Sequence, residues 1–196
     1  MKLSQASKKL SLTSAKGYDH VTGLWDDLSF KVSYPPDGRF IGRSVSFYDR
    51  RTLITPEEIP AKYSLLRLGL DQTEEVMIYA GQQNINRNET YLFSYTVFNI
   101  MGYASVRRLT KTATASGMGA KTTESTVGTY PIILEKGFSG PSNENAAGVY
   151  NTRVSAYIPF FADVKTSDTI QYGTDVFTID EMFQELQLRY LQLTKR

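Results

Sequence analysis

The sequence predicts an all-β protein, a small antiparallel β-barrel or sandwich with a long extended loop and a flexible N-terminal arm. In GRSVSFYDRRTLI, Val45 and Phe47 stand two positions apart, which is the period of a strand. The segments EEVMIYAG and ETYLFSYTVFNIM are rich in β-branched and aromatic residues and are bounded by Gly, Asn and Pro. The 13 tyrosines and 10 phenylalanines fit pleated surfaces, so we expect most of them in the core or in subunit contacts.

The opening segment, residues 1–17 (MKLSQASKKLSLTSAKG), differs from the rest of the chain in charge. It holds four lysines and no acidic residue, with Ser and Thr between scattered leucines, which is typical of a solvated arm. It lacks the continuous apolar stretch of a signal peptide, and no other stretch is long enough to span a bilayer. We therefore expect a flexible arm, one domain over residues 18–196, synthesis in a cytoplasm and no membrane partner.

The composition offers little for catalysis. The chain has no cysteine, and its single histidine, His20, has no HxxxH partner. No G-x-S-x-G motif supplies a nucleophilic serine. Adjacent carboxylates on a strand point to opposite faces, so we interpret four acidic pairs as solvated turn and edge residues: Asp26-Asp27, Glu57-Glu58, Glu74-Glu75 and Asp180-Glu181. These observations predict a protein that is not an enzyme and that uses no cofactor or metal.

The net charge of +2, from 22 basic and 20 acidic residues, is too small for a dedicated nucleic-acid binder. A superficial phosphate-loop pattern begins at Gly117 and ends in Lys121-Thr122. A true phosphate loop needs glycines where this chain has Ala115 and Ala120, so we do not expect it to bind a nucleotide.

Two segments have loop compositions, residues 111–128 and 137–148. Ordering the backbone costs about 1–2 kcal/mol per residue, whereas burial of Met118 or Val127 returns only about 1.5–3 kcal/mol each. We therefore expect residues 111–128 to be mobile in the free subunit and to be ordered by a partner, plain disorder being the alternative. The candidate contact residues are Lys111, Met118, Lys121 and Val127.

Near the C-terminus, SDTIQYGTDVF and the residues after it predict a β-hairpin over residues 169–179, with its turn at Gly173. The inward-facing residues of this hairpin should be Ile170, Tyr172, Phe177 and Ile179. The final segment has two interpretations. A capping box at residues 178–181 favours a helix, but the alternation of Leu186, Leu188 and Tyr190 favours a strand over about 185–193, with residues 180–184 as a turn. We predict the strand.

Residues 151–196 resemble the C-terminal half of tailed-phage head-closure proteins, also called head-tail joining or connector proteins. The resemblance rests on three groups of residues in order: Arg153, Val154 and Tyr157, then Asp168, Ile170, Tyr172, Phe177 and Ile179, then Leu186, Leu188 and Leu191. The chain departs from the family pattern at Ser167, where the family commonly has Gly, and at Gly173-Thr174, where Asn-Gly or Asp-Gly is common. Gly at the first turn position suits a type II′ turn, so the hairpin can survive the change.

The resemblance implies a structural virion protein of the phage neck, assembled in the host cytoplasm. Such proteins form a homo-oligomeric ring below the portal or adaptor, retain the packaged DNA and provide the docking surface for the tail. Lys111 and Lys121 would be candidates for non-specific contact with DNA in the channel. The alternatives are another tail or baseplate barrel, such as a tail terminator, and a carbohydrate-active β-sandwich.

Overall fold

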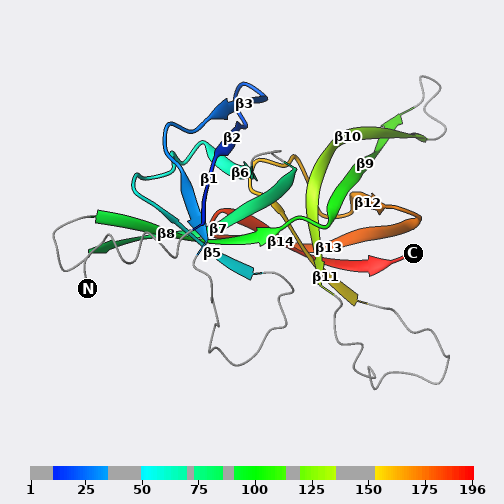
Figure 1. The fold of residues 1–196 in the computed structure, drawn as a ribbon. Helices are drawn as coiled ribbons and strands as arrows, with labels where there is room; N and C mark the ends of the chain where they lie inside the picture. The colour runs from blue at the N-terminus through cyan, green and yellow to red at the C-terminus, as the bar shows by residue number, and fades with distance from the viewer. Residues whose placement is uncertain (1–10, 35–49, 70–72, 86–90, 114–119, 136–152) are drawn as a thin grey trace, which may run out of the picture. The chain divides into compact units, whose positions relative to one another are not determined.

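The computed structural model describes residues 11–34, 50–69, 73–85, 91–113, 120–135 and 153–196. Every regular element in these ranges is a β-strand, which confirms the all-β prediction (Figure 1). The chain divides into two compact units, Met1–Ile100 and Met101–Arg196. The expectation of one domain is therefore corrected, because each half encloses a hydrophobic core of its own.

The N-terminal unit is one antiparallel sheet of eight strands in the order β1-β4-β5-β8-β7-β6-β2-β3. Its strands are β1 (Ser11–Thr13), β2 (Ala15–Asp19), β3 (Leu24–Asp27), β4 (Val32–Tyr34), β5 (Arg50–Thr55), β6 (Tyr63–Leu68), β7 (Glu74–Ile85) and β8 (Tyr91–Asn99). Two of them, β1 and β2, begin inside the predicted arm. Ala15 is buried and pairs with Leu68, so core packing and ladder hydrogen bonds order residues that composition alone assigned to solvent. Residues 1–10, like Val45 and Phe47, lie outside the described part of the chain.

Two cross-strand pairs of glycine and tyrosine lie within this sheet. A methyl group at Gly17 would overlap the Tyr63 ring, and one at Gly81 would lie 2.5 Å from Cε1 of Tyr95. Both tyrosines are buried and belong to the core cluster of this unit. The glycines are therefore needed for space, since each lets an aromatic ring lie flat over the neighbouring strand.

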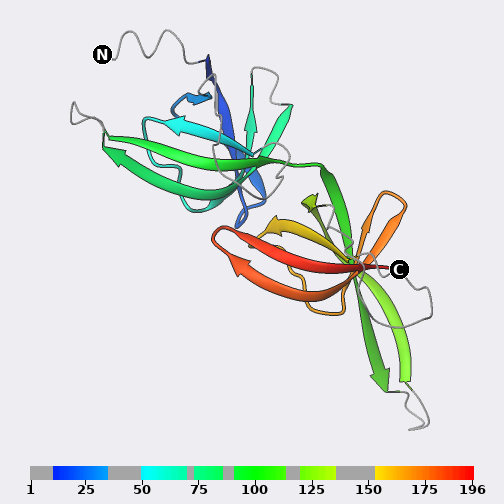
Figure 2. The same cartoon turned by 90° about the horizontal axis from the view of Figure 1, so that it is seen from below.

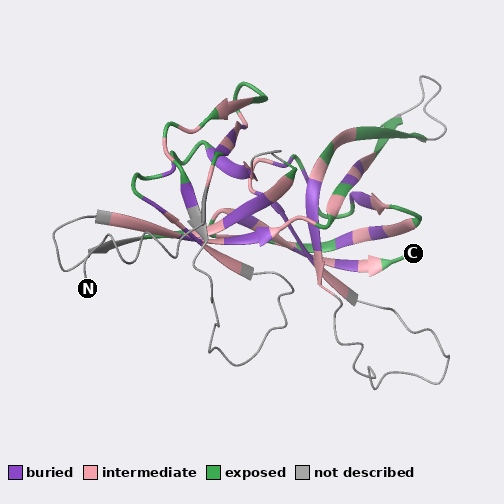
Figure 3. Ribbon diagram, in the orientation of Figure 1, coloured by how far each residue is buried: buried purple, intermediate pink, exposed green. Residues whose placement is uncertain are grey.

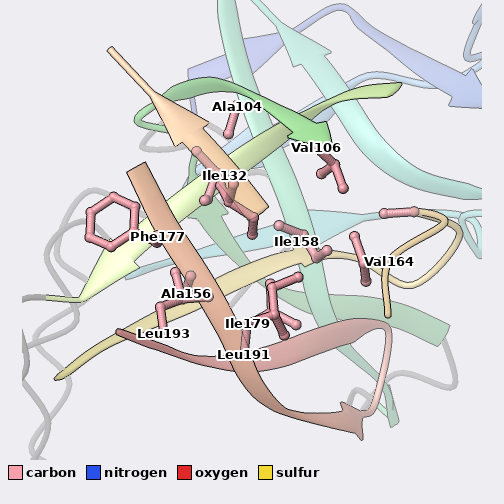
Figure 4. Close-up of a cluster of buried hydrophobic side chains, with 12 residues drawn as sticks. Ala104, Val106, Ile132, Ala156, Ile158, Val164, Phe177, Ile179, Leu191 and Leu193 are labelled. Carbon is pink, nitrogen blue, oxygen red and sulfur yellow. The ribbon is translucent and has the colours of Figure 1, made fainter. Parts of the chain in front are cut away.

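The C-terminal unit is a closed antiparallel barrel with the strand order β10-β11-β14-β13-β12-β9 (Figure 2). Its strands are β9 (Gly102–Ala113), β10 (Ala120–Glu135), β11 (Arg153–Pro159), β12 (Thr169–Tyr172), β13 (Asp175–Glu185) and β14 (Leu188–Lys195). Every strand contributes to one apolar cluster, shown in Figure 4, that includes Val106, Ile132, Ile158, Ile170, Phe177, Ile179, Leu191 and Leu193. Closure of the sheet around this core removes sheet edges from the barrel body.

The C-terminal strand is present, but its bounds and the preceding turn differ from the prediction. Residues 180–184 are part of β13, and the turn lies at Leu186 and Gln187. The pairing of β13 with β14 shifts register between Ile179 and Glu181, as at a β-bulge. This extra residue interrupts the period-two pattern within β13, at the point where the sequence predicts a turn.

The prediction of a loop at residues 111–128 is wrong for the part that the structure describes, while its mobility in the free subunit stays a prediction. Residues 111–113 and 120–128 are strand, and they pair across a long hairpin in which Ala120 lies opposite Ala113 and Thr126 opposite Arg107. Side-chain burial alone predicted a loop, but backbone hydrogen bonds join the two strands, and threonine itself favours strands. Met118 and the predicted loop at 137–148 lie outside the described residues.

Candidate functional site

The predicted hairpin lies in the barrel wall as β12 and β13, with Ile170 paired with Phe177 and Tyr172 with Asp175. Ile170, Phe177 and Ile179 are buried in the barrel core, and Tyr172 packs against that core while its hydroxyl donates to the Met101 carbonyl at 2.9 Å. Gly173 has a φ of 60°, which fits its place in the turn. The hairpin residues are therefore structural, and they position the acidic residue that precedes them.

That acidic residue, Asp168, is buried immediately before β12 and is bound by an arginine from β9. Arg108 donates from Nε to Asp168 Oδ1 at 2.9 Å and from Nη2 to Oδ2 at 2.8 Å. The Lys165 amide donates to the same carboxylate at 2.8 Å. A bidentate pair with an arginine and a backbone donor is the geometry that offsets the cost of burying a carboxylate.

The segment 160–168, between β11 and β12, closes the barrel end at which Arg108 lies. Ala162 and Val164 are buried in the core cluster. Arg189 Nη1 donates to the Ala162 carbonyl at 2.8 Å, so β14 also holds this segment. Hydrogen-bonded carbonyls and an ion pair thus fix a segment that contains no regular secondary structure.

Asp163 extends the ion pair to the surface. It receives hydrogen bonds from Arg108 Nη1 at 3.2 Å and from Nη2 at 3.1 Å. These bonds hold the pKa of the Asp163 carboxyl below its ordinary value, and the two carboxylates together raise the pKa of Arg108. Sequence reasoning singled out Asp168 but missed Arg108. The signal was available, because Ala104, Val106 and Arg108 follow one strand face, and the first two are core residues.

The remaining residues of the resemblance also lie in the barrel wall. Val154 packs against the core, Tyr157 is buried, and Leu188 and Leu191 of β14 are buried. Arg153 starts β11, and Leu186 is 61% exposed. The resemblance therefore selected mainly residues that build the barrel.

The candidate contact residues of the 111–128 segment divide between surface and core. Lys111 and Lys121 are exposed on the distal hairpin, which we define as residues 107–113 and 120–126 of β9 and β10. Val127 is partly buried against the core. Figure 3 shows the exposed class along the outer part of these strands. Lys111 lies opposite Thr122 and Lys121 opposite Thr112, so the two lysines are on opposite faces of the hairpin.

A second exposed surface lies at the turn between β13 and β14. Phe183 is 52% exposed and pairs with Tyr190, and their ring centroids lie 6.3 Å apart. Leu186 combines high exposure with a φ of 52°, a left-handed conformation that leucine rarely adopts. We name Phe183, Leu186 and Tyr190 the apolar tip.

Carboxylates border the apolar tip. Glu181 and Glu185 alternate with Phe183 on β13, so the three side chains share the outer face of the strand. Glu135 of β10 is half-buried, and β11 and β14 lie between β10 and β13. Its own burial raises the pKa of the Glu135 carboxyl most, and the negative charge of Glu185 raises it further. Acidic side chains therefore border the apolar tip on β13.

The N-terminal unit holds a polar cluster of different character, centred on Lys62. Lys62 Nζ donates to Asp19 Oδ2 at 2.8 Å and to Asp26 Oδ2 at 3.2 Å, and the Tyr63 hydroxyl donates to Asp26 at 2.7 Å. The hydrogen bond from Lys62 is the largest cause of the lowered pKa of Asp19, and the two carboxylates raise the pKa of Lys62. A lysine held cationic in this way is no proton acceptor, and the cluster holds the turn after β2 in place.

Asp19 links this cluster to the turn between β2 and β3. Its Oδ1 accepts from the Val21 amide at 2.9 Å, and its carbonyl accepts from the Gly23 amide at 2.8 Å. Nearby, His20 Nδ1 lies 2.7 Å from the Lys62 carbonyl. The structural role of His20 is thus a contact between the turn and the start of β6.

Within the residues that the structure describes, no group of three or more His, Cys, Asp or Glu residues could hold a metal ion. The same ranges contain no helix of the length and apolarity that crossing a bilayer requires. Scans against protein-family models, curated proteins and solved structures return no significant match to the chain. The fold and the exposed surfaces define a β protein of two compact units, one of which is a closed barrel that carries the distal hairpin and the apolar tip.

Proposed function

We propose that this chain is a structural subunit of a tailed-phage virion that forms a ring in the neck. It would close the DNA-filled head below the portal or adaptor and offer its other face to the tail. The proposal combines the resemblance of residues 151–196 to head-closure proteins with the construction of the C-terminal unit. It assigns no catalysis, cofactor or metal to the chain.

The observation that carries the proposal is a closed barrel from which one long hairpin projects. The barrel supports the mechanical role because its strands share one core and the pair of Arg108 and Asp168 fixes its end segment. The distal hairpin supports an assembly role because its outer residues have little core to bury and are available to a neighbouring molecule. Rigid body and projecting arm together suit a subunit that must hold its shape under the pressure of packaged DNA.

The charges of the distal hairpin fit a channel-facing or rim-facing position. Lys111 and Lys121 are exposed, and Arg107 and Glu124 form an ion pair at 3.8 Å. The hairpin therefore has a small positive excess, which suits weak contact with DNA that does not depend on sequence. Such a contact permits the DNA to slide during ejection.

Immunogold electron microscopy of particles from the phage that encodes the chain tests the proposal. We expect label at the vertex between head and tail, and we expect loss of the chain to yield heads whose DNA becomes sensitive to nuclease. Label along or at the far end of the tail would assign the chain to a tail or baseplate barrel. Turnover of a polysaccharide by the dilute monomer would contradict the structural role and favour a carbohydrate-active protein.

A further inference from the structure

The C-terminal unit carries two exposed surfaces of complementary character on different strands. The outer face of the distal hairpin presents Leu109, which is 47% exposed, together with the exposed Lys111. The apolar tip presents Phe183 and Leu186 within a border of carboxylates that includes the exposed Glu181. One surface is apolar with a cation, and the other is apolar with anions.

Strand register assigns Leu109 and Lys111 to one face of the hairpin. Leu109 lies opposite Glu124 and Lys111 opposite Thr122, whereas Thr110 lies opposite Thr123 on the other face. Since Ala104, Val106 and Arg108 point toward the barrel interior, Leu109 and Lys111 continue the barrel exterior. An approaching protein surface can therefore meet both side chains at once.

The backbone of the apolar tip is strained at Leu186, and the Leu186 side chain gains no burial in return. Leu186 occupies a left-handed conformation in which glycine or asparagine is usual, and its side chain is largely in solvent. The side-chain Nε2 of Gln184 donates to the Leu186 carbonyl at 2.8 Å and holds this turn in place. A strained, exposed leucine in a fixed turn indicates a side chain presented to another molecule.

The two surfaces lie on opposite sides of the barrel. Figure 2 shows the hairpin of β9 and β10 and the turn between β13 and β14 projecting in opposite directions from the C-terminal unit. The two surfaces therefore cannot contact each other within one copy of the chain. A contact between unlike surfaces of identical copies is heterologous, and it leads to a closed ring or to a filament.

We propose that the occupant of the apolar tip is the distal hairpin of a second copy of this chain, with Leu109 against Phe183 and Leu186, and Lys111 near Glu181. This contact rests on the proposed function in that it would be the subunit contact of the neck ring. A neck ring whose subunits meet through other residues would contradict this contact and leave the proposed function intact.

Disulfide trapping tests the contact directly, because the chain contains no cysteine. We expect the full chain carrying L109C and L186C to form a ladder of covalent oligomers under mild oxidation. The matched control carries T110C and L186C, in which the first cysteine lies on the opposite hairpin face. Comparable cross-linking of both variants, or none with L109C and L186C, would overturn the proposal.

A charge exchange provides a second measurement without new cysteines. By sedimentation velocity, K111E should weaken self-association about tenfold, and the addition of E181K should restore it to within about threefold of the parent chain. The control K121E makes the same charge change on the other face and should have no comparable effect. A chain that stays monomeric up to about 1 mM, or a double variant without recovery, contradicts the contact.

The outcomes separate this contact from the proposed function. Gold label at the neck with unaffected assembly of the K111E chain would leave the neck role standing and remove this contact. Trapped oligomers of the chain without label at the neck would keep the contact and remove the neck role.

Discussion

Arg108 Nη2 lies 2.8 Å from Asp168 Oδ2, and this ion pair joins β9 to the residue before β12 across 60 positions of sequence. The Asp168 side chain is only 4% exposed, so the arginine takes the place of the water that a carboxylate binds at the surface. The pair holds the end segment of the barrel where the projecting hairpin leaves the barrel wall. The ion pair therefore connects the barrel core to the base of the distal hairpin.

Arg108→Ala should destabilise the chain by about 3 kcal/mol, because it leaves a buried carboxylate without its cation. Chemical denaturation measures the change. The control Arg107→Ala removes an ion pair of 3.8 Å whose two side chains are 42% and 47% exposed, and should change stability by less than about 1 kcal/mol. Equal effects of the two variants would show that the pair with Asp168 contributes no more than a surface contact.

Phe177→Ala should cost about 3–5 kcal/mol, since the ring lies in the core and its removal leaves a cavity. Phe183→Ala is the matched control on the same strand, and its exposed ring should cost less than about 1 kcal/mol. Thermal unfolding of both purified variants decides the matter. An unchanged melting temperature for Phe177→Ala would contradict the core position.

Gly17→Ala should destabilise the N-terminal unit by about 1–3 kcal/mol, because the new methyl group overlaps the Tyr63 ring. In a Tyr63→Ala background the same substitution should be nearly neutral. Denaturant titration of the four chains of this double-mutant cycle gives the coupling. Additive effects would mean that the backbone, rather than the ring, resists the methyl group.

Acid should weaken the N-terminal unit through Asp19. Its pKa in the folded chain lies below the ordinary value of 3.8, mainly because Lys62 donates a hydrogen bond to the carboxylate. A depressed carboxyl pKa stabilises the fold above the unfolded value, and this stabilisation is lost as pH falls from about 4 through the lower folded pKa. Between about pH 5 and pH 2 the melting temperature of Asp19→Asn should therefore fall less with decreasing pH than that of the parent chain. Identical slopes for both chains would exclude this origin of the acid sensitivity.

Replacement of residues 109–124 by a two-residue turn should leave the barrel folded. The core residues of β9 and β10, among them Val106 and Ile132, lie outside the deletion, and a shorter connection has a lower closure entropy. Circular dichroism and thermal unfolding should match the parent chain to within a few degrees. Loss of cooperative unfolding would show that the hairpin is part of the folding unit.

The strands β7 and β8 and the hairpin at β12 and β13 followed from local pattern. Phe177 and Ile179 lie two positions apart on β13, Ile170 lies opposite Phe177, and all three are buried, because a strand sends successive side chains to opposite faces. The choice of a strand over about 185–193 left residues 180–184 as a turn, whereas β13 continues through them beyond a bulge after Ile179. Local alternation is informative only while the register is unbroken.

Tertiary structure alone decided which strands share a core, and it decided the fate of the hairpin at β9 and β10. Alternation states that a side chain faces a core, but the hydrogen bonds that choose a strand's neighbours join residues far apart in sequence. Two units therefore formed where one was expected, and Arg108 met an aspartate 60 residues away. The threonine-rich segment became paired strand because ladder hydrogen bonds between β9 and β10 offset an ordering cost that its side chains could not.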